Sequence, residues 1–289
     1  MSAPTTSFVL TLTCPDRPGL VYAVTRWVAE SGGNILDSQQ FTDTSTDVHA
    51  SGEFFLRVHF DHPEPHDPEV LAQGFHSVAE ELGMAFRLVA ADRPTRTLVM
   101  VSREAHCLND LLFRTSTGAL PIEVAAVVSN HPDLERLTTG YGVPFHHVPA
   151  TDKPAAEAKM LRLVDDLQVD LVVLARYMQI LSDDACRALA GRAINIHHSF
   201  LPSFKGARPY HQAHDRGVKL IGATAHYVTA DLDEGPIIDQ DVQRVDHRLR
   251  PVDLARVGRD VEARTLSRAV RLHAESRVLM NGPRTVVFD

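Results

Sequence analysis

Apolar and polar residues follow one another in two different patterns along this chain of 289 residues. In the first ninety residues, runs with the two-residue period of a β-strand are interspersed with two runs at helical spacing. Their order is strand, helix, strand, strand, helix, strand, which is the ferredoxin-like arrangement βαββαβ. The predicted strands are Phe8–Thr13, Asn34–Asp43, Glu53–Phe60 and Met84–Ala90, the helices are Leu20–Val28 and Pro68–Leu82, and Cys14–Gly19 is a predicted turn.

After the polar, proline-containing segment at residues 92–96, apolar strands alternate with helices. This alternation predicts a mainly parallel sheet that is covered by helices on both faces. Leu171–Ala175 is apolar throughout, as expected of a strand buried on both sides. The remaining predicted strands are Thr97–Val101, Ile122–Ser129, Phe145–Val148, Ala193–His197, Leu220–Val228 and Ile237–Val242, and the helices are Cys107–Arg114, Lys159–Leu167, Asp183–Ala190, Pro209–Asp215 and Pro251–Glu275.

The fold class is therefore α/β, in two domains. We predict a ferredoxin-like domain over residues 1–91, a linker over 92–96, and a Rossmann-like domain with a mainly parallel sheet over 97–289. Near the end of the chain, Asn281-Gly282 separates two short apolar runs, Arg277–Met280 and Thr285–Phe288. This dipeptide is a strong signal for a β-hairpin, which we assign to the second domain.

Composition and charge narrow the class of protein. The formal net charge of -8 argues against nucleic acid as the main partner, because binding to it usually requires a basic patch. The three cysteines, Cys14, Cys107 and Cys186, form no paired motif and predict reduced thiols. The first residues lack the pattern of a signal peptide, and the chain contains no apolar run of the ~20 residues that would span a membrane. We therefore expect a cytoplasmic protein without a membrane partner.

The stretch Ile194–Gly235 concentrates more potential chemistry than any other segment. Asn195 and His197 lie two residues apart on a predicted strand, so their side chains project from the same face. Asp233 follows the next strand, in a turn rich in acidic residues. Taken singly, each of these residues is more often structural than catalytic. Their convergence at strand ends is how an open α/β sheet builds a site.

Several other chemistries are excluded by the motifs that the sequence lacks. It contains no dinucleotide or P-loop glycine pattern, no nucleophile elbow and no H-E-x-x-H. His197 and His198 are neighbours on a predicted strand and should point to opposite faces, which is a poor arrangement for chelating a metal. Cys107 is better explained as a buried residue at the start of a helix than as a nucleophile. We therefore expect neither a metal nor a cofactor.

The first domain carries a short family signature. The turn DRPG before a helix, followed by GGNI, resembles the ACT domain, a small regulatory module that often binds amino acids. The resemblance implies an effector site near Asp16, Arg17, Gly19 and Asn34, with glycine or methionine as the effector. It also implies that the modules pair edge to edge, so that the protein is a homo-oligomer, either a dimer or a tetramer. Any other ferredoxin-like domain remains the alternative.

The second domain carries a longer signature. NIHHSFLPSFKGARPYHQA, followed by GATAHYVTADLDEGPII, resembles the folate-dependent formyltransferase and hydrolase family. The combination with an ACT domain covers essentially the whole chain. It implies hydrolysis of 10-formyltetrahydrofolate to formate and tetrahydrofolate, a reaction of one-carbon metabolism and purine biosynthesis, with folate as substrate. The implied catalytic residues are Asn195, His197 and Asp233. The implied substrate-binding residues are Arg176, Tyr177, Met178, Leu181, Thr229, Asp231 and Leu232, and a cis peptide bond is implied at Leu201-Pro202.

The types of these residues suit hydrolysis of a formamide. Asp233 can act as base towards water, or keep His197 in its useful protonation state. His197 and the amide of Asn195 can donate hydrogen bonds to the developing oxyanion. Both roles of Asp233 stay open at this point.

Two alternatives to hydrolysis are a transferase and a sensor. A formyltransferase would pass the formyl group to an amine such as glycinamide ribonucleotide, whose phosphate needs a glycine-rich cradle at a helix N-terminus. The corresponding segment here, Ser102–Cys107, has no glycine and carries a carboxylate. His198 stands where the transferases tend to have proline, which also favours water. A non-enzymatic sensor of amino acids and folate is disfavoured by the intact set Asn195, His197 and Asp233.

Overall fold

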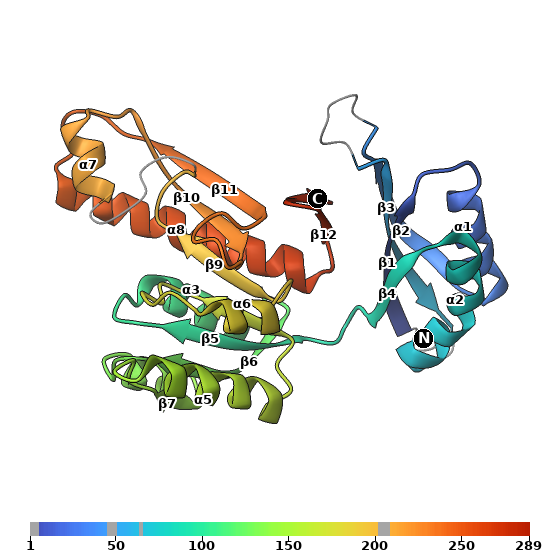
Figure 1. Cartoon of the computed structure of the whole chain (residues 1–289), viewed down its shortest axis with the longest axis horizontal. Helices are drawn as coiled ribbons and strands as arrows, with labels where there is room; N and C mark the ends of the chain where they lie inside the picture. The colour runs from blue at the N-terminus through green and yellow to red at the C-terminus, as the bar shows by residue number, and fades with distance from the viewer. Residues whose placement is uncertain (1–5, 45–50, 64–65, 202–208) are drawn as a thin grey trace. The chain divides into compact units, whose positions relative to one another are not determined.

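The computed structural model describes residues 6–44, 51–63, 66–201 and 209–289, and the chain forms two compact units (Figure 1). The first unit comprises residues 1–93 together with 275–289, and the second comprises 94–274. The predicted boundary is therefore wrong at the end of the chain, where residues from Glu275 onward belong to the first unit. Pro202 lies outside the described residues, and with it the bond to Leu201.

The first unit contains the predicted ferredoxin-like sheet. Its strands are antiparallel in the order β2-β3-β1-β4. The elements are β1 (Thr6–Pro15), α1 (Leu20–Glu30), β2 (Asn34–Thr42), β3 (Glu53–His62), α2 (Pro68–Leu82) and β4 (Ala85–Ala90). The strand β1 runs two residues further than predicted, because Cys14 and Pro15 still pair with β3. A ferredoxin-like arrangement is therefore confirmed.

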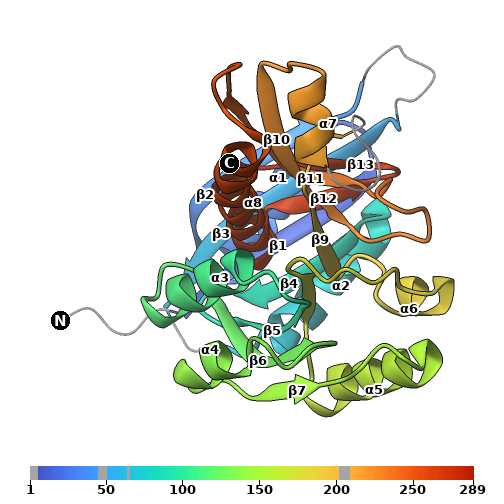
Figure 2. The same ribbon diagram turned by 90° about the vertical axis from the view of Figure 1, so that its left-hand side faces the viewer.

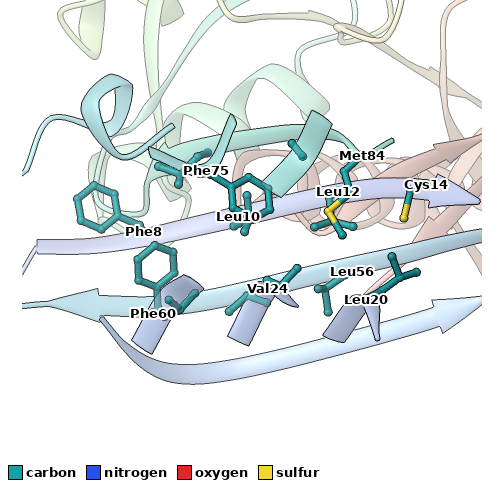
Figure 3. Close-up of a cluster of buried hydrophobic side chains, with 14 of the residues drawn as sticks. Phe8, Leu10, Leu12, Cys14, Leu20, Val24, Leu56, Phe60, Phe75 and Met84 are labelled. Carbon is teal, nitrogen blue, oxygen red and sulfur yellow. The ribbon is translucent and has the colours of Figure 1, made fainter. Parts of the chain in front are cut away.

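Alternate residues of this sheet face the two helices and form a buried core (Figure 3). Phe8, Leu10 and Leu12 all point to that face from β1 and are at most 1% exposed. They pack with Phe60 of β3 and Phe75 of α2, among others. The opposite face of the sheet is a different environment, and the carboxyl-terminal hairpin packs there.

That hairpin consists of β12 (Val278–Asn281) and β13 (Arg284–Val287). Its Leu279 and the following Phe288 form a second small cluster with Phe55, which points away from the helical face. Asp43 of the first unit is 4% exposed and accepts hydrogen bonds from the side chains of Asn281 and Arg284. These apolar and charged contacts explain why the hairpin, correctly predicted as such, belongs to the first unit.

The second unit is built on a seven-stranded sheet in the order β11-β10-β9-β8-β5-β6-β7. Strands β5 to β9 are parallel in their pairings, whereas β10 runs antiparallel to both of its neighbours. The strands are β5 (Thr95–Val101), β6 (Ile122–Ser129), β7 (Phe145–His147), β8 (Leu171–Leu174), β9 (Ala193–His197), β10 (Leu220–Tyr227) and β11 (Ile237–Arg244). The helices are α3 (His106–Ser116), α4 (Glu135–Gly140), α5 (Lys153–Asp166), α6 (Asp183–Ala188), α7 (Pro209–Asp215) and α8 (Pro251–Ala274).

Two helices differ from the prediction. The short helix α4 was not predicted, because six residues give too little periodicity to detect. Helix α5 begins at Lys153, six residues before the predicted start. Its N-cap is Asp152, whose carboxylate accepts a hydrogen bond from the backbone of Ala155, and proline occupies the first turn.

Helices cover both faces of the second sheet (Figure 2). The α5 residues Met160 and Val164 pack with Leu98 and Met100 of β5 on one face. On the other face, α8 packs against α3 and against β9, β10 and β11. None of the helices in the described ranges combines the length and the apolar character needed to cross a membrane.

Candidate active site

Asn195 of β9 and His226 of β10 form a cross-strand pair in the second sheet. The antiparallel register of β9 and β10 places the two residues directly opposite each other, so their side chains share one face. His226 Nδ1 lies 2.9 Å from the carbonyl oxygen of Tyr227 and must donate to it. His226 Nε2 can then accept from the Asn195 amide, at 3.2 Å. The pair fixes the Asn195 amide with its Nδ2 towards the acidic turn.

Asp233 lies in that turn, between β10 and β11. Its backbone adopts the left-handed conformation, with φ 57, which is uncommon for a residue other than glycine. Two residues further, a Cβ on Gly235 would overlap the carbonyl oxygen of Tyr227, so only glycine fits. The tight turn brings the Asp233 carboxylate over β9, where Asn195 Nδ2 lies 3.4 Å from its Oδ1.

The same carboxylate holds His197. Its Oδ2 lies 3.2 Å from His197 Nδ1, and the Asp233 side chain is 18% exposed. This hydrogen bond lowers the pKa of Asp233 well below its ordinary value. Asp233 is therefore ionised. The opposite nitrogen of His197, Nε2, is buried and has no partner among the described residues.

A cavity of about 270 Å³ opens over these side chains. The three predicted catalytic residues line it, and so do all seven predicted substrate-binding residues: Arg176, Tyr177, Met178, Leu181, Thr229, Asp231 and Leu232. They come from the loop after β8 and from the turn after β10. The structure thus brings the predicted residues of the second domain to one place, although their individual roles stay predictions.

His198 also lines the cavity, and its orientation was predicted wrongly. Strand β9 ends at His197, so the two neighbours do not alternate between faces. Their rings instead stack side by side, with centroids 5.0 Å apart. Arg176 Nη1 lies 2.5 Å from His198 Nδ1, and the Arg176 backbone is left-handed, with φ 64. Burial, the Arg176 charge and His197 lower the pKa of His198 to about 4.

A buried cluster around Glu262 lies behind this pair and was not predicted. Glu262 is 1% exposed on α8. It accepts hydrogen bonds from His106 Nε2, at 2.7 Å, and from the Tyr210 hydroxyl, and its Oε2 lies 3.4 Å from Arg176 Nε. Burial opposes its ionisation, but the hydrogen bond from His106 and the Arg176 charge together lower the pKa of Glu262. A carboxylate on the apolar side of an amphipathic helix was the available signal.

His106, Cys107 and Glu262 offer ligand atoms within 4.8 Å of one another. Glu262 is already engaged by three neighbours. Burial raises the pKa of the Cys107 thiol far above its ordinary value, which disfavours the thiolate that a metal or a nucleophile needs. Cys107 therefore fits the predicted role of a buried helix-start residue, and the other two residues are joined by a hydrogen bond.

The predicted effector residues of the first unit do not gather in one place. Asp16, Arg17 and Gly19 follow β1 at the end of the sheet where Pro15 pairs with Glu53. Asn34 begins β2 at the opposite end, opposite Asp61. These two positions on β3, Glu53 and Asp61, are eight residues apart, which is roughly 26 Å along a strand. Within one chain, these residues cannot contact a single amino acid.

Comparison with known proteins accounts for both units. The ACT domain pattern matches residues 8–68, and the Formyl transferase pattern matches residues 95–270. A formyltetrahydrofolate deformylase of Corynebacterium sp. (strain P-1) is 51% identical over 283 residues, 97% of each chain. The chain belongs to the formyltetrahydrofolate deformylase family.

Solved structures separate this family from its relatives. The formyltetrahydrofolate deformylase of Burkholderia mallei superposes with a TM-score of 0.91 at 49% identity, over 98% of this chain and 100% of that one. Glycinamide ribonucleotide transformylase 1 of Symbiobacterium toebii has a TM-score of 0.65 at 35% identity and covers 70% of this chain. The deformylase likeness extends over both units, whereas the transformylase likeness covers only part of the chain.

Proposed function

We propose that this protein hydrolyses 10-formyltetrahydrofolate to formate and tetrahydrofolate, with Asp233, His197 and Asn195 as the catalytic residues. The observation that carries the proposal is the convergence of these three side chains on one cavity, in a chain of the deformylase family. The reaction adds water to a linear amide. A C–O bond forms, the bond from carbon to N10 breaks, and N10 gains a proton as formate leaves.

Asn195 and His197 stabilise the oxyanion that forms on the formyl group. In this mechanism His197 Nδ1 donates to Asp233, and Nε2, its unpartnered nitrogen, donates to the oxyanion, which requires a proton on both nitrogens. The two contacts of Asn195 Nδ2, at 3.2 and 3.4 Å, are at the weak end for hydrogen bonds. A negatively charged oxygen competes well for one of those hydrogens, since charge-assisted bonds are stronger.

Asp233 also directs the water. Its Oδ2 is committed to His197, whereas its Oδ1 has only the longer contacts to Asn195 and His226. Oδ1 therefore accepts a hydrogen bond from the attacking water. The low pKa of Asp233 makes it a weak base in the free enzyme, so its first role is to orient His197. The proton lost by the water is passed on to the departing N10.

The segment between β5 and α3 supports water over a phosphorylated amine as the acceptor. Glu104 lies 3.8 Å from His106 Nδ1, and Glu262 contacts His106 from the other side. These two carboxylates, of which Glu104 also pairs with Arg259 at 3.5 Å, lie near the helix end that would otherwise attract a phosphate. A formyltransferase that uses glycinamide ribonucleotide is therefore the less favoured function.

The first experiment measures formate release from 10-formyltetrahydrofolate without any amine acceptor, for the parent and for Asp233→Asn. We expect turnover by the parent and a loss of ~10²–10⁴-fold in kcat for the variant, because a positioned acid–base group contributes about that much. Glu234→Gln is the matched control. It removes a negative charge from the same turn, at an exposed position outside the cavity, and should keep the parent rate.

The outcomes separate the candidate functions. Turnover that appears only when glycinamide ribonucleotide is added would make the protein a transferase. Absence of turnover under both conditions would leave a sensor. An Asp233→Asn variant as active as the parent would remove Asp233 from the mechanism while keeping the hydrolase.

Regulation by an amino acid such as glycine or methionine, and assembly into a dimer or tetramer, are further parts of the proposal. The ACT pattern in the first unit supports both. Strand β2 is an edge of its sheet and exposes Leu36 and Phe41 to 53% and 46%, which suits edge-to-edge pairing. Because Asn34 lies far from Asp16 in one chain, an effector site containing both requires two copies. Sedimentation with and without glycine or methionine tests assembly and effector together.

A further inference from the structure

We propose that His198 is a further catalytic residue, which Arg176 fixes as a neutral imidazole so that its Nε2–H holds the attacking water. The inference rests on the proposed hydrolysis. Its physical basis is the short chain of contacts from the buried Glu262, through Arg176, to the cavity.

The Arg176 contact determines where the proton of His198 sits. A guanidinium can only donate hydrogen bonds. Arg176 Nη1 lies 2.5 Å from His198 Nδ1, so Nδ1 must accept and carries no hydrogen. In the neutral ring the hydrogen is then on Nε2. Protonating Nδ1 would place two donors against each other, so the contact excludes the charged ring as well as the other tautomer.

His198 Nε2 is available to a ligand in the cavity. His198 lines the cavity with Asn195 and His197. Its Nδ1 is taken by Arg176, and its Nε2 has no partner among the described residues. The ring of His198 is stacked on His197, so the two imidazoles present their edges to neighbouring positions. A water that accepts from His198 and donates to Asp233 keeps one lone pair for the formyl carbon.

Glu262 acts through Arg176 as a positioning residue. Besides Arg176, it binds His106 and the Tyr210 hydroxyl, which prevents the carboxylate from turning away. The Tyr210 ring reaches it because Gly258, one turn earlier on α8, has no side chain; a Cβ there would overlap the ring. Residues of α3, α7 and α8 thus together fix the position of Arg176, which sets the tautomer of His198.

The charges around His198 sustain the neutral ring. Arg176 from the loop after β8 and His197 from β9 oppose a positive charge on it, whereas Glu262 of α8 and Asp233 of the β10–β11 turn favour one. With burial, the first two dominate, and the pKa of His198 falls to about 4. The hydrogen donor in the cavity is therefore the same from pH 5 upwards. Replacing Arg176 by Met removes the largest of the opposing charges.

The test compares His198→Ala and His198→Gln with the parent in formate release. We expect His198→Ala to lower kcat by ~10²-fold with KM unchanged, since misplacement of a reacting group costs about that much. His198→Gln can place an amide donor near the former Nε2 and should recover part of that loss. His147→Gln, an exposed histidine of the same unit, is the control. Arg176→Met should shift the acid limb of the kcat profile to higher pH.

Added hydroxylamine distinguishes a role in holding water from a structural one. Hydroxylamine attacks the formyl carbon itself, displaces N10 and gives N-hydroxyformamide in place of formate. If His198 holds the water, His198→Ala raises the ratio of hydroxamate to formate at a fixed hydroxylamine concentration. An unchanged ratio, or a raised KM with parental kcat, would overturn the inference and leave the hydrolase intact. A parent that releases no formate would instead refute the proposed function.

Discussion

Two carboxylates of the second unit, Asp233 and Glu262, each contact histidines but lie in different environments. Asp233 is 18% exposed, faces a cavity and is held by contacts of 3.2 to 3.7 Å. Glu262 is 1% exposed and is held by His106 at 2.7 Å and by Tyr210. The first has loose contacts that a substrate can replace, whereas the second has contacts that close it off. Loose contacts at a cavity indicate chemistry, and closed contacts indicate support.

In the proposed mechanism, the site is divided between residues that react and residues that position them. Asn195, His197 and Asp233 lie within 39 residues of sequence and are brought together by one strand pair and one turn. The Glu262 cluster draws on α3, α7, α8 and the loop after β8. The reacting groups thus depend on local register, whereas their support depends on the packing of distant helices.

Replacing each carboxylate by alanine should distinguish the two residues most clearly by the loss in unfolding free energy. Glu262→Ala leaves Arg176 buried without its partner, and breaking a buried pair in this way typically costs ~3–5 kcal/mol of unfolding free energy. Asp233→Ala should cost less than Glu262→Ala, because the contacts of Asp233 are longer and its side chain is more exposed. Urea unfolding of both measures the difference, with Asp260→Ala, an exposed carboxylate on α8, as the control. Equal losses of unfolding free energy in the two variants would refute the division into a supporting and a reacting carboxylate.

Asn195 should affect turnover with little effect on stability. Asn195→Ala removes one oxyanion donor, and such a loss typically lowers kcat by ~10²–10³-fold. Its partner His226 keeps the hydrogen bond to Tyr227. Steady-state kinetics and thermal unfolding together give the measurement, and Asn109→Ala, exposed on α3, serves as the control. A large fall in melting temperature with parental kcat would place Asn195 among the supporting residues.

Gly258 provides the smallest expected effect. Gly258→Ala should force Tyr210 away from Glu262, and overpacking of this kind typically costs ~1–3 kcal/mol. Gly74→Ala on α2 meets no atom closer than 3.9 Å and should instead gain up to ~1 kcal/mol from helix propensity. Chemical unfolding of the two variants compares them directly. A gain for both would show that Tyr210 adjusts without loss.

The sequence could predict that the proposed catalytic residues lie together, because they are close to one another along the chain. The period of β9 places Asn195 and His197 on one face, and the turn chemistry after β10 places Asp233 nearby. His198 could be named but not oriented, since its direction depends on where β9 ends. The Glu262 cluster joins residues more than 150 apart, as His106 and Glu262 show, and no local pattern reports such a pairing.

The fold could be predicted to a similar extent and for similar reasons. Strand and helix periods gave the order of elements in both units, apart from the short α4 and the early start of α5. The hairpin at Asn281-Gly282 was visible in the sequence, but its place against the first sheet was not. That place depends on Phe55 and Asp43, which lie more than two hundred residues earlier. The separation of Asn34 from Asp16 likewise follows from strand register, which single residues do not show.

The return of the chain to its first unit has a consequence for synthesis. The first unit contains residues 1–93 and, far along the chain, residues 275–289. Asp43 receives its partner Asn281 only 238 residues later, and the outer face of the sheet stays uncovered until then. The second unit has by that time been made in full. Although domains usually fold in the order of their synthesis, the first unit of this protein can be completed only after the second unit, residues 94–274, has been made.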